Sequence, residues 1–199
     1  MNKARIERGL RPANSIWLWG EGVRADLDAF KGKYGLNASM ISAVDLLKGI
    51  GKFSDMTVVE VEGATGYIDT NFEGKAQAAI DEFRRGQDFV YIHVEAPDEC
   101  GHRNETDNKV KSIGLIDKLI LSPVVEELRK LGDFKVLVTP DHPTPLSLKT
   151  HTNDPVPFLI YDSTAPKDGV KNGFSEKTAK STGLFIEKGF TMMKKFING

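Results

Sequence analysis

Short apolar runs alternate with amphipathic stretches along most of the chain. The apolar runs predict strands, and several are continuously apolar rather than alternating, which is typical of a parallel sheet covered on both faces. The alternation therefore predicts an α/β fold, with a layered, mostly parallel sheet and helices on both faces. In such folds functional sites gather where the strands end. The predicted strands are 16–19, 38–42, 56–61, 89–94, 135–139 and 156–161.

The amphipathic stretches predict the helices between these strands. Ala76, Ala79, Ile80 and Phe83 share one helical face, and the segment 69–71 before them is rich in N-cap residues. A longer helix is predicted over 107–131, and its Ser122-Pro123 pair predicts a kink, or a stop and restart. Residues 3–11 are polar and helical in character, 163–181 read as a loop, and 185–197 predict a C-terminal helix docked on the sheet.

Composition narrows the class of protein. With 199 residues, 40% hydrophobic and 28% charged, the chain is expected to form a single globular domain over 1–199. A net charge of -1 gives no electrostatic reason to bind nucleic acid or an anionic membrane. No apolar run reaches the ~18 residues of a membrane span. A single cysteine excludes an intrachain disulfide and agrees with the reducing cytoplasm.

Carboxylate and imidazole side chains gather in three segments near predicted strand ends. Asp98 and His102 have the i, i+4 spacing of two ligands on one helical turn, although a capping Asp beside a surface His would look the same. Asp141 and His142 directly follow a predicted strand, and His151 lies in a polar loop, where a histidine is usually just solvated. Together they predict a site for divalent ions such as Zn, Mn or Co. Two-metal sites of this kind act on phosphoryl groups.

Three other features of these segments have more than one interpretation. His93 lies inside an apolar run, so we expect a packed or supporting histidine rather than a ligand. Cys100 lies between Asp98 and His102, where it is either a soft ligand or a small packed residue. The loop 62–66 could present backbone N–H groups to a phosphate, but an ordinary strand-to-helix connection is the simpler interpretation.

The same segments resemble the second half of cofactor-independent phosphoglycerate mutases of the archaeal type, in the alkaline-phosphatase superfamily. The resemblance covers about residues 5–161 in consistent order. It rests on short sequence motifs at 14–22, 41–50, 63–71, 93–98, 101–102, 140–145 and 151–157.

The resemblance implies roles for the five predicted ligands. In such enzymes two divalent ions (Mn, Zn, Co or Mg) flank a serine nucleophile. The serine carries the phosphoryl group between the two hydroxyls of a small phosphoglycerate, so that 3-phosphoglycerate and 2-phosphoglycerate interconvert through a phosphoserine. By resemblance, Asp98, His102 and His151 hold one ion, and Asp141 and His142 contribute to the second.

The sequence departs from that family pattern at its start. The remaining second-metal Asp in a Gly-Asp-Gly, the nucleophilic Ser and the inserted substrate domain do not precede Lys3. We therefore expect a C-terminal part without the nucleophile, inactive alone, whose partner is a missing N-terminal segment or a second copy in a homo-oligomer. The alternatives are a non-catalytic metal-binding subunit that requires a partner chain, or a related phosphatase, phosphopentomutase-like or homoserine-kinase-labelled enzyme.

Overall fold

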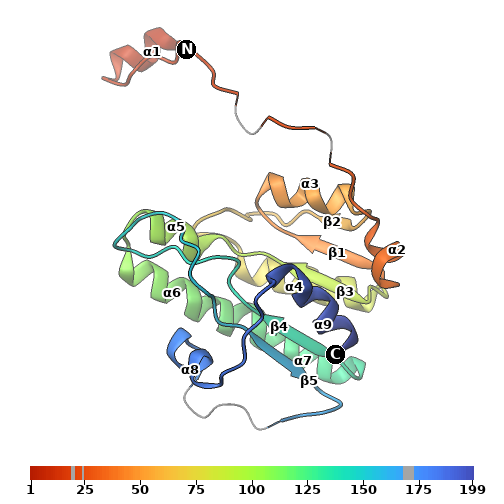
Figure 1. Cartoon of the computed structure of the whole chain (residues 1–199). Coiled ribbons are helices and arrows are strands. Elements are labelled where there is room, and N and C mark those ends of the chain that lie inside the picture. Colours follow the sequence, from red (N-terminus) through yellow and green to blue (C-terminus); the bar gives the residue numbers. More distant parts are fainter. Residues whose placement is uncertain (19–20, 24, 168–172) are drawn as a thin grey trace.

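A three-stranded parallel sheet forms the centre of the fold (Figure 1). The computed structural model describes residues 1–18, 21–23, 25–167 and 173–199. All four residues of the central strand are buried, because strands flank it on both sides and helices cover its faces. The register places Met40 opposite Val58 and Tyr91. This arrangement confirms the predicted parallel α/β class. The strand order is β2 (Thr57–Val59), β1 (Ala38–Ile41), β3 (Phe89–Ile92).

The last two strands form a separate antiparallel pair, β4 (Lys135–Val138) and β5 (Leu159–Asp162), with Val136 opposite Tyr161. The apolar runs predicted both strands but not their direction. A parallel pair needs a crossover connection, usually a helix. The segment between β4 and β5 contains no helix, so the chain turns back antiparallel. That connecting segment carries three of the five predicted ligands.

The strand predicted at 16–19 is wrong over its described part. Residues 16–18 belong to no strand or helix of the described chain, and their side chains are among the most exposed apolar groups described. Trp19 lies outside the described residues. An apolar run becomes a strand only where a neighbouring strand accepts its backbone hydrogen bonds, and no strand of the described residues pairs with this segment.

The predicted helices form around the sheet with well-defined ends. Asn71 caps α4 (Phe72–Arg84) by accepting a hydrogen bond from the Gly74 amide at 2.8 Å, as the capping signal predicted. The stretch predicted as a helix with either a kink or a stop and restart at Ser122-Pro123 is α6 (Thr106–Ile116), a π-helical segment (Asp117–Leu121) and α7 (Ser122–Leu131). Pro123 cannot donate a backbone hydrogen bond. The helical hydrogen bonds before it change to the wider i to i+5 pattern of a π-helix, and the helix continues.

The main core lies between the central strand and the apolar faces of α4, the π-helical segment and α7. Ile41 and Ala79 are completely buried in it. Two further helices, α3 (Asp45–Phe53) and α5 (Ala96–His102), follow β1 and β3 in the chain. The buried members of the core are Ile41, Phe72, Ala76, Ala79, Ile80, Ala96, Ile120, Val124 and Leu128.

The termini are less well packed than the core. The predicted C-terminal helix is present as α9 (Met192–Asn198), and the Phe196 ring lies 6.4 Å from the Phe89 ring of β3. Phe185 and Phe190 are exposed, so the prediction that they dock on the sheet is wrong. The other short elements are α1 (Asn2–Glu7), α2 (Phe30–Tyr34), α8 (Glu176–Ser181), which lies inside the stretch predicted as loop, and a 3-10 turn (Gly189–Thr191).

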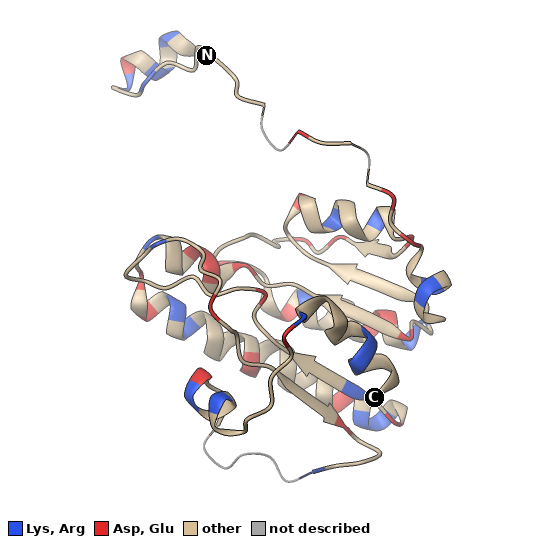
Figure 2. Ribbon diagram, viewed as in Figure 1, with Lys and Arg blue, Asp and Glu red and all other residues tan. Residues whose placement is uncertain are grey.

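Positively and negatively charged side chains are mixed along the helices and strands. Figure 2 shows Lys and Arg interspersed with Asp and Glu along the helices around the sheet. Among the described residues, no helix is both long enough and apolar enough to cross a membrane.

Candidate metal centre

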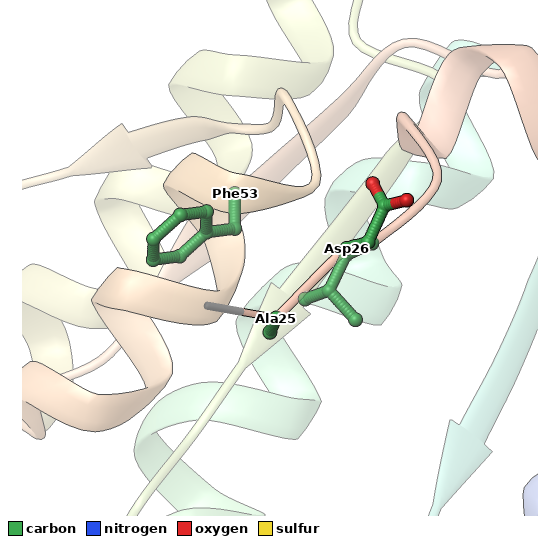
Figure 3. A pocket seen from close by; sticks show the side chains of 4 residues that line it. Ala25, Asp26 and Phe53 are labelled. Atoms are coloured by element: carbon green, nitrogen blue, oxygen red, sulfur yellow. The ribbon is translucent and has the colours of Figure 1, made fainter. Parts of the chain in front are cut away.

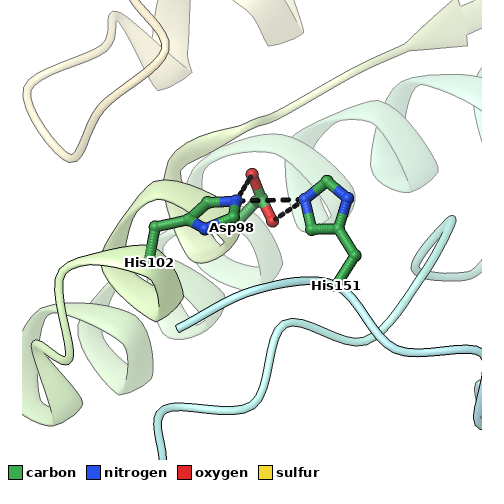
Figure 4. A group of neighbouring side chains, drawn as sticks. All are labelled: Asp98, His102 and His151. Atoms are coloured by element: carbon green, nitrogen blue, oxygen red, sulfur yellow. Dashed lines mark hydrogen bonds and ion pairs between the residues drawn. The ribbon is translucent and has the colours of Figure 1, made fainter. Parts of the chain in front are cut away.

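Three of the five predicted ligands meet in one cluster of donor atoms (Figure 4). Asp98 and His102 lie one turn apart on α5, and His151 approaches them from the segment between β4 and β5. The His102 and His151 Nε2 atoms are 3.0 Å apart. One Asp98 oxygen lies 3.3 Å from the His102 Nε2, and the other lies 3.2 Å from the His151 Nε2.

A backbone carbonyl determines which nitrogen of His102 faces the cluster. The His102 Nδ1 lies 2.9 Å from the Lys149 carbonyl oxygen, which can only accept a hydrogen bond. Nδ1 therefore carries the proton, and in the neutral ring Nε2 presents a lone pair to Asp98 and His151. Lys149 adopts a left-handed conformation, with φ 55°, that few non-glycine residues adopt. Such support of the second ring nitrogen is usual for metal-ligating histidines.

The separations between these donors match those expected of ligands on a shared ion. Ligands at the ~2.0–2.1 Å bond lengths of a tetrahedral zinc site lie about 3.3 Å apart, and octahedral neighbours lie slightly closer. The observed 3.0 to 3.3 Å separations fall in this range, with each imidazole measured to a different oxygen of the Asp98 carboxylate. Two imidazole nitrogens and a carboxylate are also a donor set that divalent transition metals prefer. The residues present therefore fit a divalent ion.

The remaining predicted pair, Asp141 and His142, lies beside this cluster rather than within it. The His142 ring packs against the His151 ring, with centroids 3.7 Å apart, while its Nε2 lies 3.4 Å from an Asp141 oxygen. Thr144 connects the two groups. Its hydroxyl donates a hydrogen bond to Asp98 Oδ1 and lies 3.4 Å from the His142 Nδ1. The structure thus brings all five residues into one region as a group of three and an adjacent pair.

Sequence reasoning did not identify Glu95 and Glu99, whose carboxylate oxygens approach Asp98 on α5. Burial, with the neighbouring Glu99 and Asp98 charges, raises the pKa of Glu95. Its carboxylate lies against Gly66, at a place where any side chain would collide with it. The absence of a side chain at Gly66 therefore allows this close approach. The run of acidic residues in 95–99 was the only signal for this cluster in the sequence.

His93 and Cys100 are packed residues in the structure. His93 follows β3 with its Nδ1 3.4 Å from the Ser42 hydroxyl, and burial lowers the pKa of its ring. Cys100 is completely buried, and burial raises the pKa of its thiol. Neither belongs to the group formed by Asp98, His102 and His151 in the described part of the chain.

The loop 62–66 uses its backbone groups internally. The amides of Ala64 and Thr65 donate to the Val61 carbonyl and the Thr70 hydroxyl, and the Glu62 carbonyl accepts from Asn71. This pattern favours an ordinary connection over a phosphate-binding loop. A shallow hollow elsewhere is lined by Ala25, Asp26, Leu27 and Phe53 and includes none of the five predicted ligands (Figure 3).

Lys75 is a buried lysine that contacts the backbone directly after β3. Its side chain is completely buried, and its Nζ donates a hydrogen bond to the His93 carbonyl at 2.9 Å. Burial lowers the pKa of Lys75 from its usual 10.5 to about 8, against the opposing influence of the Glu95 carboxylate.

This lowered pKa predicts a pH-dependent stability. Between about pH 8 and 10.5 the unfolded chain binds more protons at this lysine than the folded protein does, so the free energy of unfolding rises with pH in that window. Lys75→Met removes the effect. We expect the stability of the variant relative to wild type to fall steadily as pH rises from about 7.5 to 10. Urea unfolding at several pH values measures this, with exposed Lys111→Met as the control, and a pH-independent difference for Lys75→Met would contradict it.

Comparisons with known proteins identify the family to which this chain belongs. A family model described as the Metalloenzyme superfamily matches residues 4–197. A relative from Geobacter sulfurreducens, named probable 2,3-bisphosphoglycerate-independent phosphoglycerate mutase, is 46% identical over 196 residues, which make up 98% of this chain and 49% of the relative. A Methanosarcina barkeri protein of the corresponding name is 47% identical over 94% of this chain and 47% of its own length.

Two solved structures share the fold. A protein of Pyrococcus horikoshii matches with a TM-score of 0.70 and 30% identity, over 77% of this chain and 46% of that one. The cofactor-independent phosphoglycerate mutase of Thermoplasma acidophilum matches with a TM-score of 0.64 and 26% identity, over 100% of this chain and 46% of that one. The chain spans about half the length of the curated relatives it matches.

Proposed function

The chain belongs to the Metalloenzyme superfamily, and from this membership we propose that Asp98, His102 and His151 bind one divalent cation. Asp141 and His142 contribute two ligands to a second ion. The observation that carries the proposal is the cluster of two Nε2 atoms and two carboxylate oxygens with separations of 3.0 to 3.3 Å. The native ion belongs to the group Mn, Zn, Co and Mg, which share these ligand types.

We further propose that these ions serve the interconversion of 3-phosphoglycerate and 2-phosphoglycerate through a phosphoserine. The support is the 46–47% identity to relatives named phosphoglycerate mutases, which favours this isomerase activity over the phosphatase, phosphopentomutase-like and homoserine-kinase alternatives. Bound divalent ions stabilise negative charge on a transferring phosphoryl group and lower the pKa of the attacking hydroxyl. A phosphoglycerate substrate also agrees with the proposed cytoplasmic location.

The residues of this chain would prepare the site for that chemistry. The Lys149 carbonyl keeps the proton of the neutral His102 ring on Nδ1. The lone pair of Nε2 is then available to the cation. The Thr144 hydroxyl donates to Asp98 Oδ1 and orients the carboxylate towards the two imidazoles. Both contacts hold the donor atoms in place before an ion binds, which reduces the cost of ordering them.

The 199 residues supply five ligands but no serine that we assign as nucleophile. We propose that they form one unit corresponding to the C-terminal part of the mutase core. The nucleophile, the missing ligand and the substrate domain then come from a further segment or a partner chain. The half-length match to the relatives supports this. So does the exposure of Ile16, Trp17 and Leu18, which offer apolar surface to a partner.

We expect the 199-residue chain with added Mn²⁺ to bind the metal but not to interconvert the phosphoglycerates. Mixing it with the part of the Geobacter sulfurreducens relative that it does not match should restore turnover, and Asp98→Asn should abolish the restored activity. A coupled enolase assay measures the rate. Turnover by the chain alone at ordinary enzyme rates would show that the nucleophile lies within these residues and would overturn this division of the site.

A further inference from the structure

Lys109 of α6 connects the two segments that carry the predicted metal ligands. Its ammonium group donates a hydrogen bond of 2.9 Å to the Pro97 carbonyl and another of 3.0 Å to the Thr144 carbonyl. Pro97 directly precedes Asp98 on α5, and Thr144 lies two residues after His142. One half-buried cation therefore joins the backbones of both ligand segments, which are more than forty residues apart in sequence.

The two segments are in close contact around this lysine. A Cβ atom at Gly101 would lie 2.6 Å from the Thr144 carbonyl oxygen and 2.9 Å from the Lys109 Nζ. The Thr144 hydroxyl in turn donates to Asp98. The position of the Thr144 backbone therefore determines both the orientation of the Asp98 carboxylate and the approach of the Asp141–His142 pair to α5.

Two other hydrogen bonds join these segments through the ligand side chains themselves, from His102 to the Lys149 carbonyl and from the Thr144 hydroxyl to Asp98. The segment 139–151 contains no helix and no strand, so no regular backbone ladder orients its ligands. The two hydrogen bonds from Lys109 go to backbone carbonyls and use none of the predicted ligand atoms. Hydrogen bonds from a charged donor are also stronger than those between neutral groups.

We propose that Lys109 is a positioning residue that sets the distance between α5 and the segment 139–151, and through it the affinity of the Asp98, His102 and His151 site for a divalent ion. Lys109 contacts backbone carbonyls only and does not itself bind the ion. This role rests on the proposed metal site, because it assigns to Lys109 the geometry of that site.

Lys109→Met tests the proposal, because methionine keeps most of the side-chain length and loses both hydrogen bonds. Lys111→Met is the matched control, two residues along the same helix and exposed. We expect Lys109→Met to weaken Co²⁺ binding at least tenfold, to change the visible spectrum of bound Co²⁺, and to speed amide hydrogen exchange in 140–152 without metal. Lys111→Met should match wild type. Lys109→Arg, which keeps the cationic donors, should recover part of the affinity.

The outcomes separate this role from the metal site itself. Wild-type affinity, spectrum and exchange in a folded Lys109→Met protein would overturn the positioning role and leave the metal site standing. Absence of Co²⁺ binding by wild type would overturn both. If Lys109→Met does not fold, Lys109→Gln, which keeps one neutral donor, is measured in the same way, and its unchanged affinity would equally overturn the role.

Discussion

Replacing Asp98 with asparagine is expected to weaken Mn²⁺ or Co²⁺ binding by more than about 100-fold, because changes even to groups behind the ligands cost 10- to 100-fold. Asp98 is the only carboxylate in the group with His102 and His151, and each of its oxygens faces one imidazole. Asparagine has nearly the same shape and can still accept the Thr144 hydrogen bond. The loss therefore reports the missing negative charge and ligand rather than a change of fold. Isothermal titration calorimetry measures the affinity, and circular dichroism checks the fold.

Asp107→Asn is the matched control, since it makes the same change of charge at an exposed position at the start of α6. Its metal affinity should stay within about twofold of wild type, because water and salt screen the charge of an exposed side chain that is no member of the ligand group. If Asp98→Asn bound the ion as tightly as Asp107→Asn, the proposed ligand group would be wrong.

Histidine variants then separate the two proposed ions. His151→Ala removes a donor from the group of three and should reduce the tighter binding event as strongly as Asp98→Asn. His142→Ala should leave that event largely intact and affect a weaker one, because its Nε2 faces Asp141 rather than Asp98. The reverse order of effects would assign His142 to the first ion.

Gly101→Ala is expected to destabilise the protein by about 1–3 kcal/mol, the usual cost of overpacking a filled site. Alanine favours a helix over glycine by up to about 1 kcal/mol, so by propensity alone the change within α5 should stabilise. The new Cβ would lie 2.6 Å from the Thr144 carbonyl oxygen, which belongs to backbone and cannot rotate away. Displacing Thr144 should also weaken metal binding. Urea unfolding and Co²⁺ titration of the same variant measure both effects.

Gly114→Ala provides the opposite result as a control. Gly114 also lies within a helix, α6, but apart from its chain neighbours and the nearby helix backbone no atom of the described residues lies within 4 Å of its added Cβ. The substitution should raise the free energy of unfolding by about 0.5–1 kcal/mol and leave metal affinity unchanged. Equal stability changes for the two variants would show that the contact between α5 and Thr144 is not close in solution.

Local patterns predicted those elements whose stability depends on nearby residues. The N-cap residues at 69–71 and the apolar face of Ala76, Ala79, Ile80 and Phe83 predicted α4, because capping and amphipathicity act within a few turns. The same reasoning was wrong at 16–18. Those residues have the composition of a strand, but a strand also requires a neighbour to accept its hydrogen bonds.

The i, i+4 spacing of Asp98 and His102 was enough to place two donors on one face, because helix geometry is local. No spacing predicts that Lys149 directs its carbonyl to His102, that Thr144 donates to Asp98, or that Lys109 joins Pro97 to Thr144. These contacts depend on how the segment between β4 and β5 returns to α5.

The sequence by itself thus determined the α/β class, the strands and helices around the core, and the residue types able to hold divalent ions. The direction of β5, the separation of the five ligands into a group of three and an adjacent pair, and the backbone contacts that hold them were decided only by the tertiary structure. The physical reason is the distance along the chain over which each kind of interaction acts. Periodicity, capping and helical spacing act over a few residues, whereas the donors of this metal centre meet across a loop closure of some fifty residues.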